Sequence, residues 1–202
     1  SHKFTVNSKS MVEMYSIHRA DAQFIPNGAK RYKVRNMDIL QRNNLVENQY
    51  YLFASRLDPV KRLHILLEAY VRLPENYKFP LVIAGGHDKD IIYKKQLEAY
   101  GCNKIIFLGH IPNSMLEPLM KNCRAFILPS VLEGMSNSLL SAMAYSRAVI
   151  TADIPENRDV VKMDDAVFQR DNVEQLLLKL LRISSDPIFN RATLHSTSGY
   201  KT

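Results

Sequence analysis

The middle of the chain repeats one pattern, in which a short apolar run is followed by a turn and then by a longer amphipathic segment. The apolar runs predict strands at Tyr50–Leu57, Pro80–Gly86, Lys104–His110, Ala125–Leu128, Ala148–Ile154 and Ala166–Arg170. The amphipathic segments predict helices at Val60–Arg72, Lys89–Tyr100, Asn113–Asn122, Asn137–Tyr145, Glu156–Val161 and Val173–Ser184. Because the strands are apolar on both faces and alternate with helices, the pattern predicts an α/β fold. We expect a doubly wound, Rossmann-like parallel sheet of about six strands with helices on both faces.

The two ends of the chain differ from this repeat. Residues 4–16 predict a short strand and then a helix, and Ala22–Gly28 predicts another short strand and a turn. Residues 36–49 are polar and are predicted to form a connection. Beyond Pro187 no period is visible. Residues 1–202 are therefore expected to form one domain, with a distinct segment at about 1–28 and a loosely ordered tail at about 187–202.

Composition restricts the class of protein. The apolar fraction is 46%, which is ordinary for a globular protein, and no apolar run approaches the ~18 residues that a membrane span needs. The first residues lack the pattern of a signal peptide. The spacing of Cys102 and Cys123 does not suggest a metal site, and two reduced thiols in a cytoplasmic protein are the expected state.

The net charge is +7 and the pI is about 9.4, which leaves nucleic acid, an anionic membrane or a phosphate-bearing ligand as partners. The basic residues are scattered, and the tightest run, Ala29–Arg35, follows a turn and is typical of a solvated loop. No basic stripe with interleaved aromatic residues is present, so nucleic acid is not favoured.

Two cations lie where ligands bind in such sheets, which is beyond the carboxyl ends of the strands. Arg56 ends its predicted strand, and Lys61 opens the helix that follows. Two cations together with helix N-terminal amides can bind a diphosphate without metal. The alternative is a solvated pair of charges. Four glycines also fall just past predicted strands, where turns alone would equally explain them: Gly85, Gly86, Gly109 and Gly134.

A second loop of this kind begins at Glu133, between the strand Ala125–Leu128 and the next helix. The backbone of Met135 to Leu139 can offer free N–H groups to phosphate or hydroxyl oxygens. Glu133 can accept hydrogen bonds from sugar hydroxyls or stabilise positive charge growing at an anomeric carbon. The alternative role for Glu133 is a carboxylate that caps the helix.

The remaining candidates are weaker. His87 and His110 lie at the same edge and can hydrogen-bond a ligand, but no nucleophile accompanies them. Asp88 and Asp90 have the spacing of a metal-binding pair, although a helix N-cap explains them equally well, and no metal is expected.

Five segments in order resemble one family: "FIPNGA", "SRLDPVKRLHILLEAY", "LVIAGG", "IIFLGHIPNSMLEPLMKNCRAFILPS" and "EGMSNSLLSAMAYSRAVITADIPENRDVV". The chain resembles the C-terminal, donor-binding half of a retaining glycosyltransferase of the GT-B fold, from the large group 1, or family four. The resemblance implies transfer of a sugar from a UDP-, GDP- or ADP-sugar to a polysaccharide or glycolipid, without metal or cofactor. It also implies that residues 1–28 lie on the hinge side.

The resemblance assigns roles to positions of this chain. Arg56 and Lys61 match the cations that hold the donor diphosphate, and Glu133 matches the first carboxylate of a Glu-x7-Glu motif that contacts the transferred sugar. Gly109, His110 and Ile111 match the turn beside the nucleotide base. The loop whose backbone binds sugar and phosphate is matched by Gly134, Met135, Ser136, Asn137, Ser138 and Leu139.

The chain departs from this family at the ribose position. Ser141 stands where the motif has its second Glu, and the loss of charged hydrogen bonds there would weaken donor binding by roughly tenfold to a thousandfold. Milder departures are Ser146, where Gly is usual, and Ala148, where Pro is usual. Altered donor handling, lost activity and a mutation at this position all remain open. The alternative function is a catalytically silent module that binds a nucleotide or glycan.

The resemblance also implies a second, N-terminal domain that binds the acceptor, and only a few residues precede the "IPNG" turn. We therefore expect the 202 residues alone to bind a nucleotide or nucleotide sugar weakly and not to turn over. The parent protein is expected to be cytoplasmic. Its positive charge would favour peripheral contact with the inner, anionic membrane face.

Overall fold

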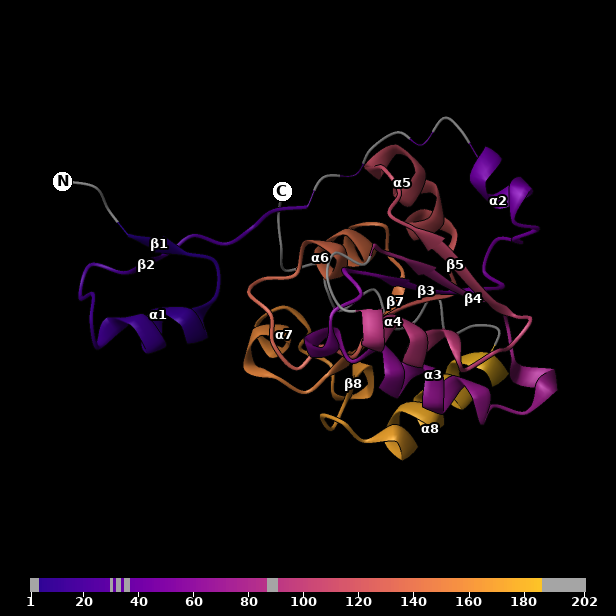
Figure 1. The fold of residues 1–202 in the computed structure, drawn as a ribbon. Coiled ribbons are helices and arrows are strands. Elements are labelled where there is room, and N and C mark those ends of the chain that lie inside the picture. Colours follow the sequence, from indigo (N-terminus) through magenta and orange to yellow (C-terminus); the bar gives the residue numbers. More distant parts are fainter. Residues whose placement is uncertain (1–3, 30, 32–33, 35–36, 87–90, 187–202) are drawn as a thin grey trace.

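The computed structural model describes residues 4–29, 31, 34, 37–86 and 91–186, and a six-stranded sheet lies at its centre (Figure 1). Its strands are β3 (Tyr51–Ala54), β4 (Leu81–Ala84), β5 (Ile105–Gly109), β6 (Ala125–Leu128), β7 (Ala148–Ala152) and β8 (Val167–Phe168). All neighbours are parallel, in the order β5-β4-β3-β6-β7-β8. This is the doubly wound, Rossmann-like order. The predicted fold class is confirmed.

Side chains alternate between the two faces of each strand, and helices cover both faces. Tyr51 and Phe53 pack on the side of α3 (Leu63–Val71), α4 (Ile91–Glu98) and α8 (Val173–Ser185). Leu52 and Ala54 pack on the side of α2 (Asp38–Arg42), α5 (Asn113–Asn122), α6 (Asn137–Ala144) and α7 (Pro155–Val160). Every residue of β3 is buried, which is why its sequence shows a continuous apolar run.

Two predicted segments differ in the structure. The helix expected over Val60–Arg72 is divided into a 3-10 turn, η1 (Pro59–Lys61), and α3, because Arg62 adopts a left-handed conformation with φ +52°. The polar connection expected over residues 36–49 contains α2, whose Leu40 is buried and which packs against α5. Two further 3-10 turns are η2 (Glu75–Tyr77) and η3 (Asp164–Ala166).

The first described residues form a small unit beside the main sheet, coloured indigo in Figure 1. Strands β1 (Thr5–Val6) and β2 (Gln23–Phe24) pair in parallel, and α1 (Lys9–Ser16) connects them, so the predicted strand, helix and strand are present. We call residues 4–28 the N-terminal unit. Ser10 Oγ donates a hydrogen bond of 2.6 Å to Glu156 Oε1, which joins α1 to α7. The predicted tail at 187–202 lies outside the described residues.

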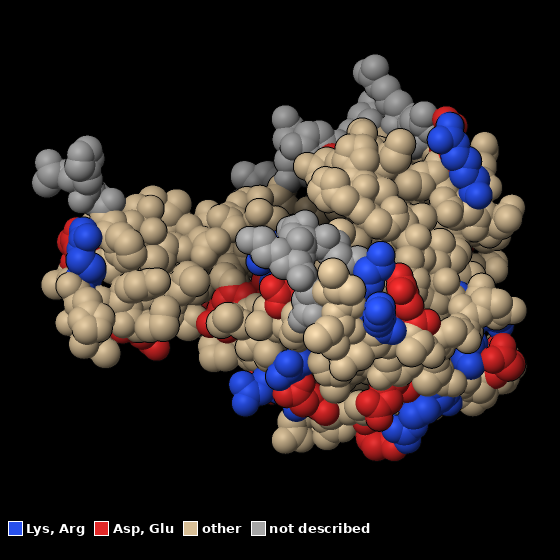
Figure 2. All heavy atoms as spheres, viewed as in Figure 1, with Lys and Arg blue, Asp and Glu red and all other residues tan. Residues whose placement is uncertain are grey.

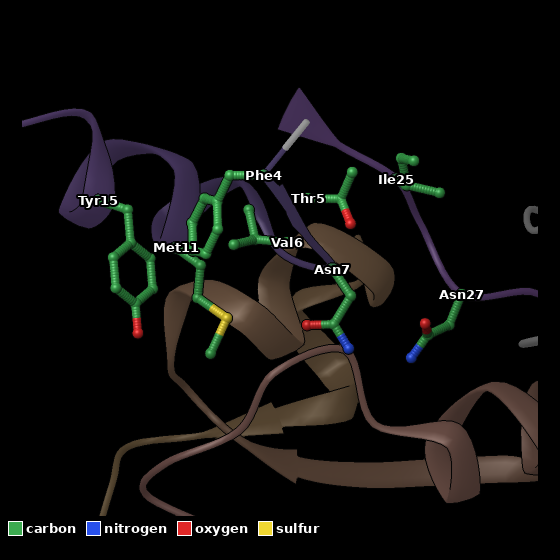
Figure 3. Close-up of a pocket in the computed structure, with 8 residues that line it drawn as sticks. All are labelled: Phe4, Thr5, Val6, Asn7, Met11, Tyr15, Ile25 and Asn27. Carbon is green, nitrogen blue, oxygen red and sulfur yellow. The ribbon is translucent and has the colours of Figure 1, made fainter. Parts of the chain in front are cut away.

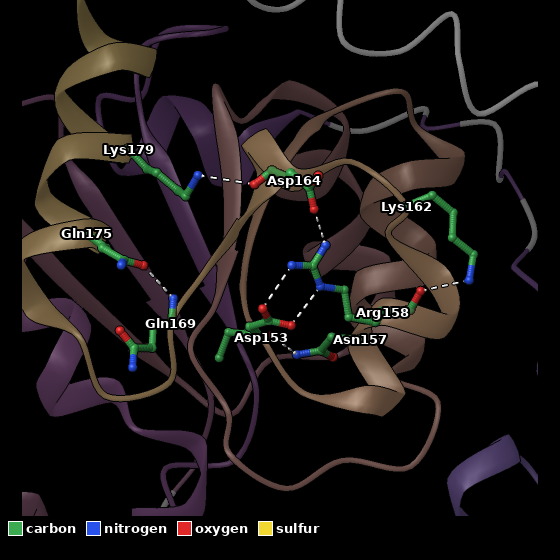
Figure 4. A network of polar contacts seen from close by, with 9 residues as sticks. Asp153, Asn157, Arg158, Lys162, Asp164, Gln169, Gln175 and Lys179 are labelled. Carbon is green, nitrogen blue, oxygen red and sulfur yellow. Dashed lines mark hydrogen bonds and ion pairs between the residues drawn. The ribbon is translucent and has the colours of Figure 1, made fainter.

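A polar network fixes the segment between β7 and β8 (Figure 4). Arg158 of α7 donates to both carboxylate oxygens of Asp153, at 2.7 and 2.8 Å, and to Asp164 Oδ1 at 2.6 Å. The hydrogen bonds from Arg158 lower the pKa of Asp153. This network therefore holds α7, on which the N-terminal unit rests, against the end of the sheet.

Charged side chains of both signs are interspersed on the face shown in Figure 2. Ion pairs in the described part of the chain include Arg182 with Asp165 at 2.8 Å and Arg72 with Glu174. On this face, the described residues therefore form no continuous positive patch. The helices of the described part of the chain include none that is long and apolar enough to cross a membrane.

Candidate functional site

The loops that follow β3 and β6 meet at the carboxyl edge of the sheet. These strands are neighbours, but α3 follows one on the first face and α6 follows the other on the opposite face. The two connections therefore diverge at this edge, which is where ligands bind in open α/β sheets, and we call the region between them the crevice. The Val131 N–H donates to the Val60 carbonyl at 3.0 Å, and this hydrogen bond joins the two loops.

Lys61 and Glu133 form an ion pair in this crevice. The distance from Lys61 Nζ to Glu133 Oε1 is 2.8 Å, and the two side chains are 11% and 9% exposed. Each charge thus offsets part of the desolvation cost of the other. The prediction placed Lys61 at the start of an α-helix, whereas it ends η1 and is separated from α3 by Arg62. A three-residue turn has little dipole, so Lys61 contributes mainly its own charge.

Arg56 lies two residues beyond β3, at the same edge of the sheet. Its side chain is exposed and makes no hydrogen bond or ion pair with another described residue. The structure therefore brings Lys61 to Glu133 but does not bring Arg56 into contact with either. An exposed guanidinium with no partner in the described chain can turn toward an anion in the crevice.

The loop from Glu133 into α6 offers backbone donors, although fewer than expected. Ser136 caps the helix, and its Oγ accepts a hydrogen bond from the Leu139 N–H at 3.4 Å. The prediction counted Leu139 among the free amides, and the cap makes that part wrong. The amides of residues 134–138 make no hydrogen bond to any other described residue. They lie at the positive end of α6, where an anion is favoured.

The N-terminal unit contacts this loop through two asparagines that sequence analysis missed. Asn27 Nδ2 donates to the Met135 carbonyl at 3.0 Å and to Asn137 Oδ1 at 2.9 Å. A Cβ built on Gly134 would lie 2.7 Å from Asn7 Oδ1. Figure 3 shows both asparagines near this loop, at one side of a hollow of about 480 Å³ lined by the N-terminal unit. The segment "FIPNGA" was recognised in the sequence, but its contact with the loop was not.

The turn after β5 lies farther along the same edge. Gly109 has φ +66°, His110 is exposed and Ile111 is half-buried. The Gly85 N–H donates to the Gly109 carbonyl at 2.8 Å, which ties this turn to the end of β4. Strand β4 therefore separates the predicted base-side turn from Arg56 and Lys61. The candidates His87, Asp88 and Asp90 lie outside the described residues.

Ser141 lines a second hollow, of about 220 Å³, between α5 and α6. Asn137 and Ser138 line it too, so it adjoins the first turn of α6. Position 141 thus faces a cavity rather than the core, and this cavity is next to the free amides of the Glu133 loop.

Comparison with known proteins identifies the family to which this region belongs. The sequence profile described as "Glycosyl transferases group 1" matches residues 37–198. O-antigen chain mannosyltransferase B of Escherichia coli is 28% identical over 156 residues, covering 74% of this chain and 40% of that protein. An Escherichia coli UDP-Gal:alpha-D-GlcNAc-diphosphoundecaprenol alpha-1,3-galactosyltransferase is 27% identical over 161 residues, covering 75% and 39%. The chain thus spans about two-fifths of the length of these relatives.

Solved structures share the fold. The structure of Anabaena HepE in complex with UDP and glucose superposes with a TM-score of 0.84 at 21% identity, covering 96% of this chain and 56% of that one. WaaG, a glycosyltransferase involved in lipopolysaccharide biosynthesis, gives a TM-score of 0.81 at 18% identity, covering 98% and 59%. The match to the family profile over most of the six-stranded sheet and its crevice shows that this chain belongs to the group 1 glycosyltransferases.

Proposed function

We propose that this chain is the donor-binding domain of a glycosyltransferase that transfers a sugar from a nucleotide diphosphate sugar to a polysaccharide or glycolipid. The transfer is metal-independent and retains the configuration at the anomeric carbon. A second domain in the parent protein binds the acceptor. The names of the relatives support this class of reaction, since they are transferases of O-antigen chains and lipid-linked sugars.

The observation that carries the proposal is the Lys61–Glu133 pair beside the amides of residues 134–138, which have no partner in the described chain. An ammonium has three donors, so Lys61 can hold Glu133 and a phosphate oxygen at the same time. Arg56 and the amides at the start of α6 supply the remaining donors for a diphosphate. The crevice therefore brings donors for an anion and a carboxylate together at one edge of the sheet.

The chemistry follows from these charges. As the bond between the anomeric carbon and the diphosphate breaks, its electron pair leaves with the diphosphate. Lys61, Arg56 and the amides stabilise that growing negative charge without a metal. Glu133 stabilises the positive charge that develops on the sugar. The acceptor hydroxyl then bonds to the carbon on the face that the diphosphate leaves, which retains the configuration, and its proton passes to an oxygen of the leaving diphosphate.

Calorimetric titration of the chain with UDP, GDP and ADP tests the proposal. Arg56→Ala is the informative variant, because Arg56 is exposed and its loss should not disturb the fold. We expect it to weaken binding about tenfold to a hundredfold. Lys104→Ala is the matched control, since Lys104 pairs with Glu75 at 3.0 Å, before the start of β5 and away from the crevice. Equal binding by both variants would contradict the diphosphate site.

Ser141 supports a second function, a catalytically silent module that binds the nucleotide or glycan without transfer. The distinguishing measurement is sugar transfer by the chain after its N-terminal domain has been supplied. Nucleotide binding without transfer would favour the silent module. Transfer that depends on Glu133 would favour the enzyme. The chain alone should show no robust turnover.

The net charge of +7 favours attraction of the parent protein to an anionic membrane surface. Flotation with liposomes measures this contact. Binding that does not increase with the fraction of anionic lipid would rule it out.

A further inference from the structure

The hollow between α5 and α6 is large enough for one part of a nucleotide but not for a whole one. Its volume of about 220 Å³ lies below the roughly 300–1,000 Å³ of pockets that enclose a whole drug-sized molecule. Helices α5 and α6 pack against each other there. The wall is formed chiefly by side chains of these helices: Leu116, Glu117, Met120, Asn137, Ser138 and Ser141. A single pentose ring is a suitable occupant.

Glu117 is the charged side chain of this hollow. Among the described lining residues it alone carries a charge, and it is half-buried. It makes no hydrogen bond or ion pair with any other described residue. A carboxylate that is partly removed from water without a partner loses hydration that nothing in the described chain replaces. The vicinal diol of a ribose has two O–H donors and would satisfy it with charge-assisted hydrogen bonds.

The position of the hollow agrees with the geometry of a nucleotide. Asn137 and Ser138 line it and also form the first turn of α6, where the proposed function places the diphosphate. In a nucleoside diphosphate the ribose is attached to the phosphate through a single carbon. The ribose must therefore lie beside that first turn, and this hollow is a described cavity that adjoins it.

We propose that Glu117 of α5 binds the ribose hydroxyls of the donor and supplies the carboxylate that Ser141 of α6 cannot. The two residues line the same cavity from different helices. This inference rests on the proposed function, because it needs a diphosphate at the start of α6. On this inference, the carboxylate that accepts hydrogen bonds from the ribose has moved from position 141 to Glu117 and has not been lost.

The test compares ribonucleotides with their 2′,3′-dideoxy analogues by calorimetry, using UDP, GDP and ADP on the 202-residue chain. Glu117→Gln should weaken binding of the preferred ribonucleotide about tenfold to a hundredfold, leave its dideoxy analogue unchanged and leave inorganic pyrophosphate unchanged. Glu98→Gln, on α4 and paired with Lys94, is the matched control. An unchanged thermal midpoint of Glu117→Gln shows that the fold is intact.

Substitutions at position 141 provide a second part of the binding test. Ser141→Glu in the Glu117→Gln background should restore binding, because it returns one carboxylate to the cavity. Ser141→Glu alone should not tighten binding, because two carboxylates would repel each other there. Tight binding by Ser141→Glu alone, or equal binding of ribose and dideoxy forms by the parent chain, would overturn the inference. Failure of pyrophosphate and every nucleotide to bind would instead overturn the proposed function.

Discussion

The ammonium of Lys61 lies 2.8 Å from the carboxylate of Glu133, although 72 residues separate them in the chain. Both side chains are about nine-tenths buried, so removal of one leaves a buried charge without its partner. We expect Lys61→Met to lower the free energy of unfolding by about 3 kcal/mol, measured by urea unfolding.

A double-mutant cycle checks that this loss reflects the pair. Lys61→Met combined with Glu133→Leu should recover most of the stability, because two apolar side chains leave no charge behind. Additive losses from the two single variants would show that the ion pair does not couple them.

Position 85 requires glycine because the structure leaves no space for a Cβ atom there. A Cβ at this position would lie 1.9 Å from the carbonyl oxygen of Ser55, which is backbone and cannot turn away. We expect Gly85→Ala to cost about 3 kcal/mol in thermal or urea unfolding. Gly28→Ala is the matched control, because a Cβ there meets no atom within 4 Å. Similar unfolding midpoints for the two variants would contradict the predicted clash.

The pH dependence of stability should include a contribution from His64. Burial, and then the nearby cation of Arg62, lower the pKa of this imidazole below its usual 6.5, although Asp171 and Glu68 oppose the shift. As pH falls through 6.5, the unfolded chain therefore takes up a proton before the folded chain does. The contribution of neutral His64 to the free energy of unfolding is therefore present above pH 6.5 and is lost as the pH falls below it.

His64→Gln measures this contribution. The Tyr93 hydroxyl lies 3.0 Å from His64 Nδ1, and an amide can keep that hydrogen bond. We expect the urea midpoint of the parent to fall more between pH 7.5 and pH 5.5 than that of the variant. Parallel pH profiles of the two proteins would exclude His64 as the source.

The N-terminal unit should order the Glu133 loop through Asn27. Its amide donates to the Met135 carbonyl and to the Asn137 side chain, and Asn27→Asp would place a carboxylate against these two oxygens. We expect faster amide hydrogen exchange at Leu139 and Leu140, whose N–H groups donate to Ser136, in Asn27→Asp and a smaller increase in Asn27→Ala. Asn43→Asp, on the main body and far from the loop in sequence, is a suitable control. Unchanged exchange in all three would show that the contact does not order the loop.

The sequence was sufficient to predict the six parallel strands, because each is buried on two faces and its apolar run has few alternatives. It did not reveal α2, since that helix has only five residues, of which Leu40 is buried and Ile39 is partly buried, and the other three are polar. The break at Arg62 was also hidden, because arginine has no special preference for a positive φ.

The candidate site was predictable in part. Lys61 and Glu133 each follow the carboxyl end of a predicted strand. Because parallel strands all end on the same side of a sheet, the sequence placed both residues at one edge. Contacts over long sequence separations, such as that from Asn27 to Met135, depend on how the N-terminal unit packs. No local pattern encodes that packing. The shared cavity of Glu117 and Ser141 likewise depends on the packing of two helices.

Gly134 and Asn7 lie so close that no side chain fits between them. The backbone of the Glu133 loop and the turn between β1 and α1 are therefore neighbours in direct contact. A rigid rotation of residues 4–28 toward the sheet would push this loop, and a rotation away would release it. Any shift of the N-terminal unit would then reach the amides of residues 134–138 directly, through the side chain of Asn7.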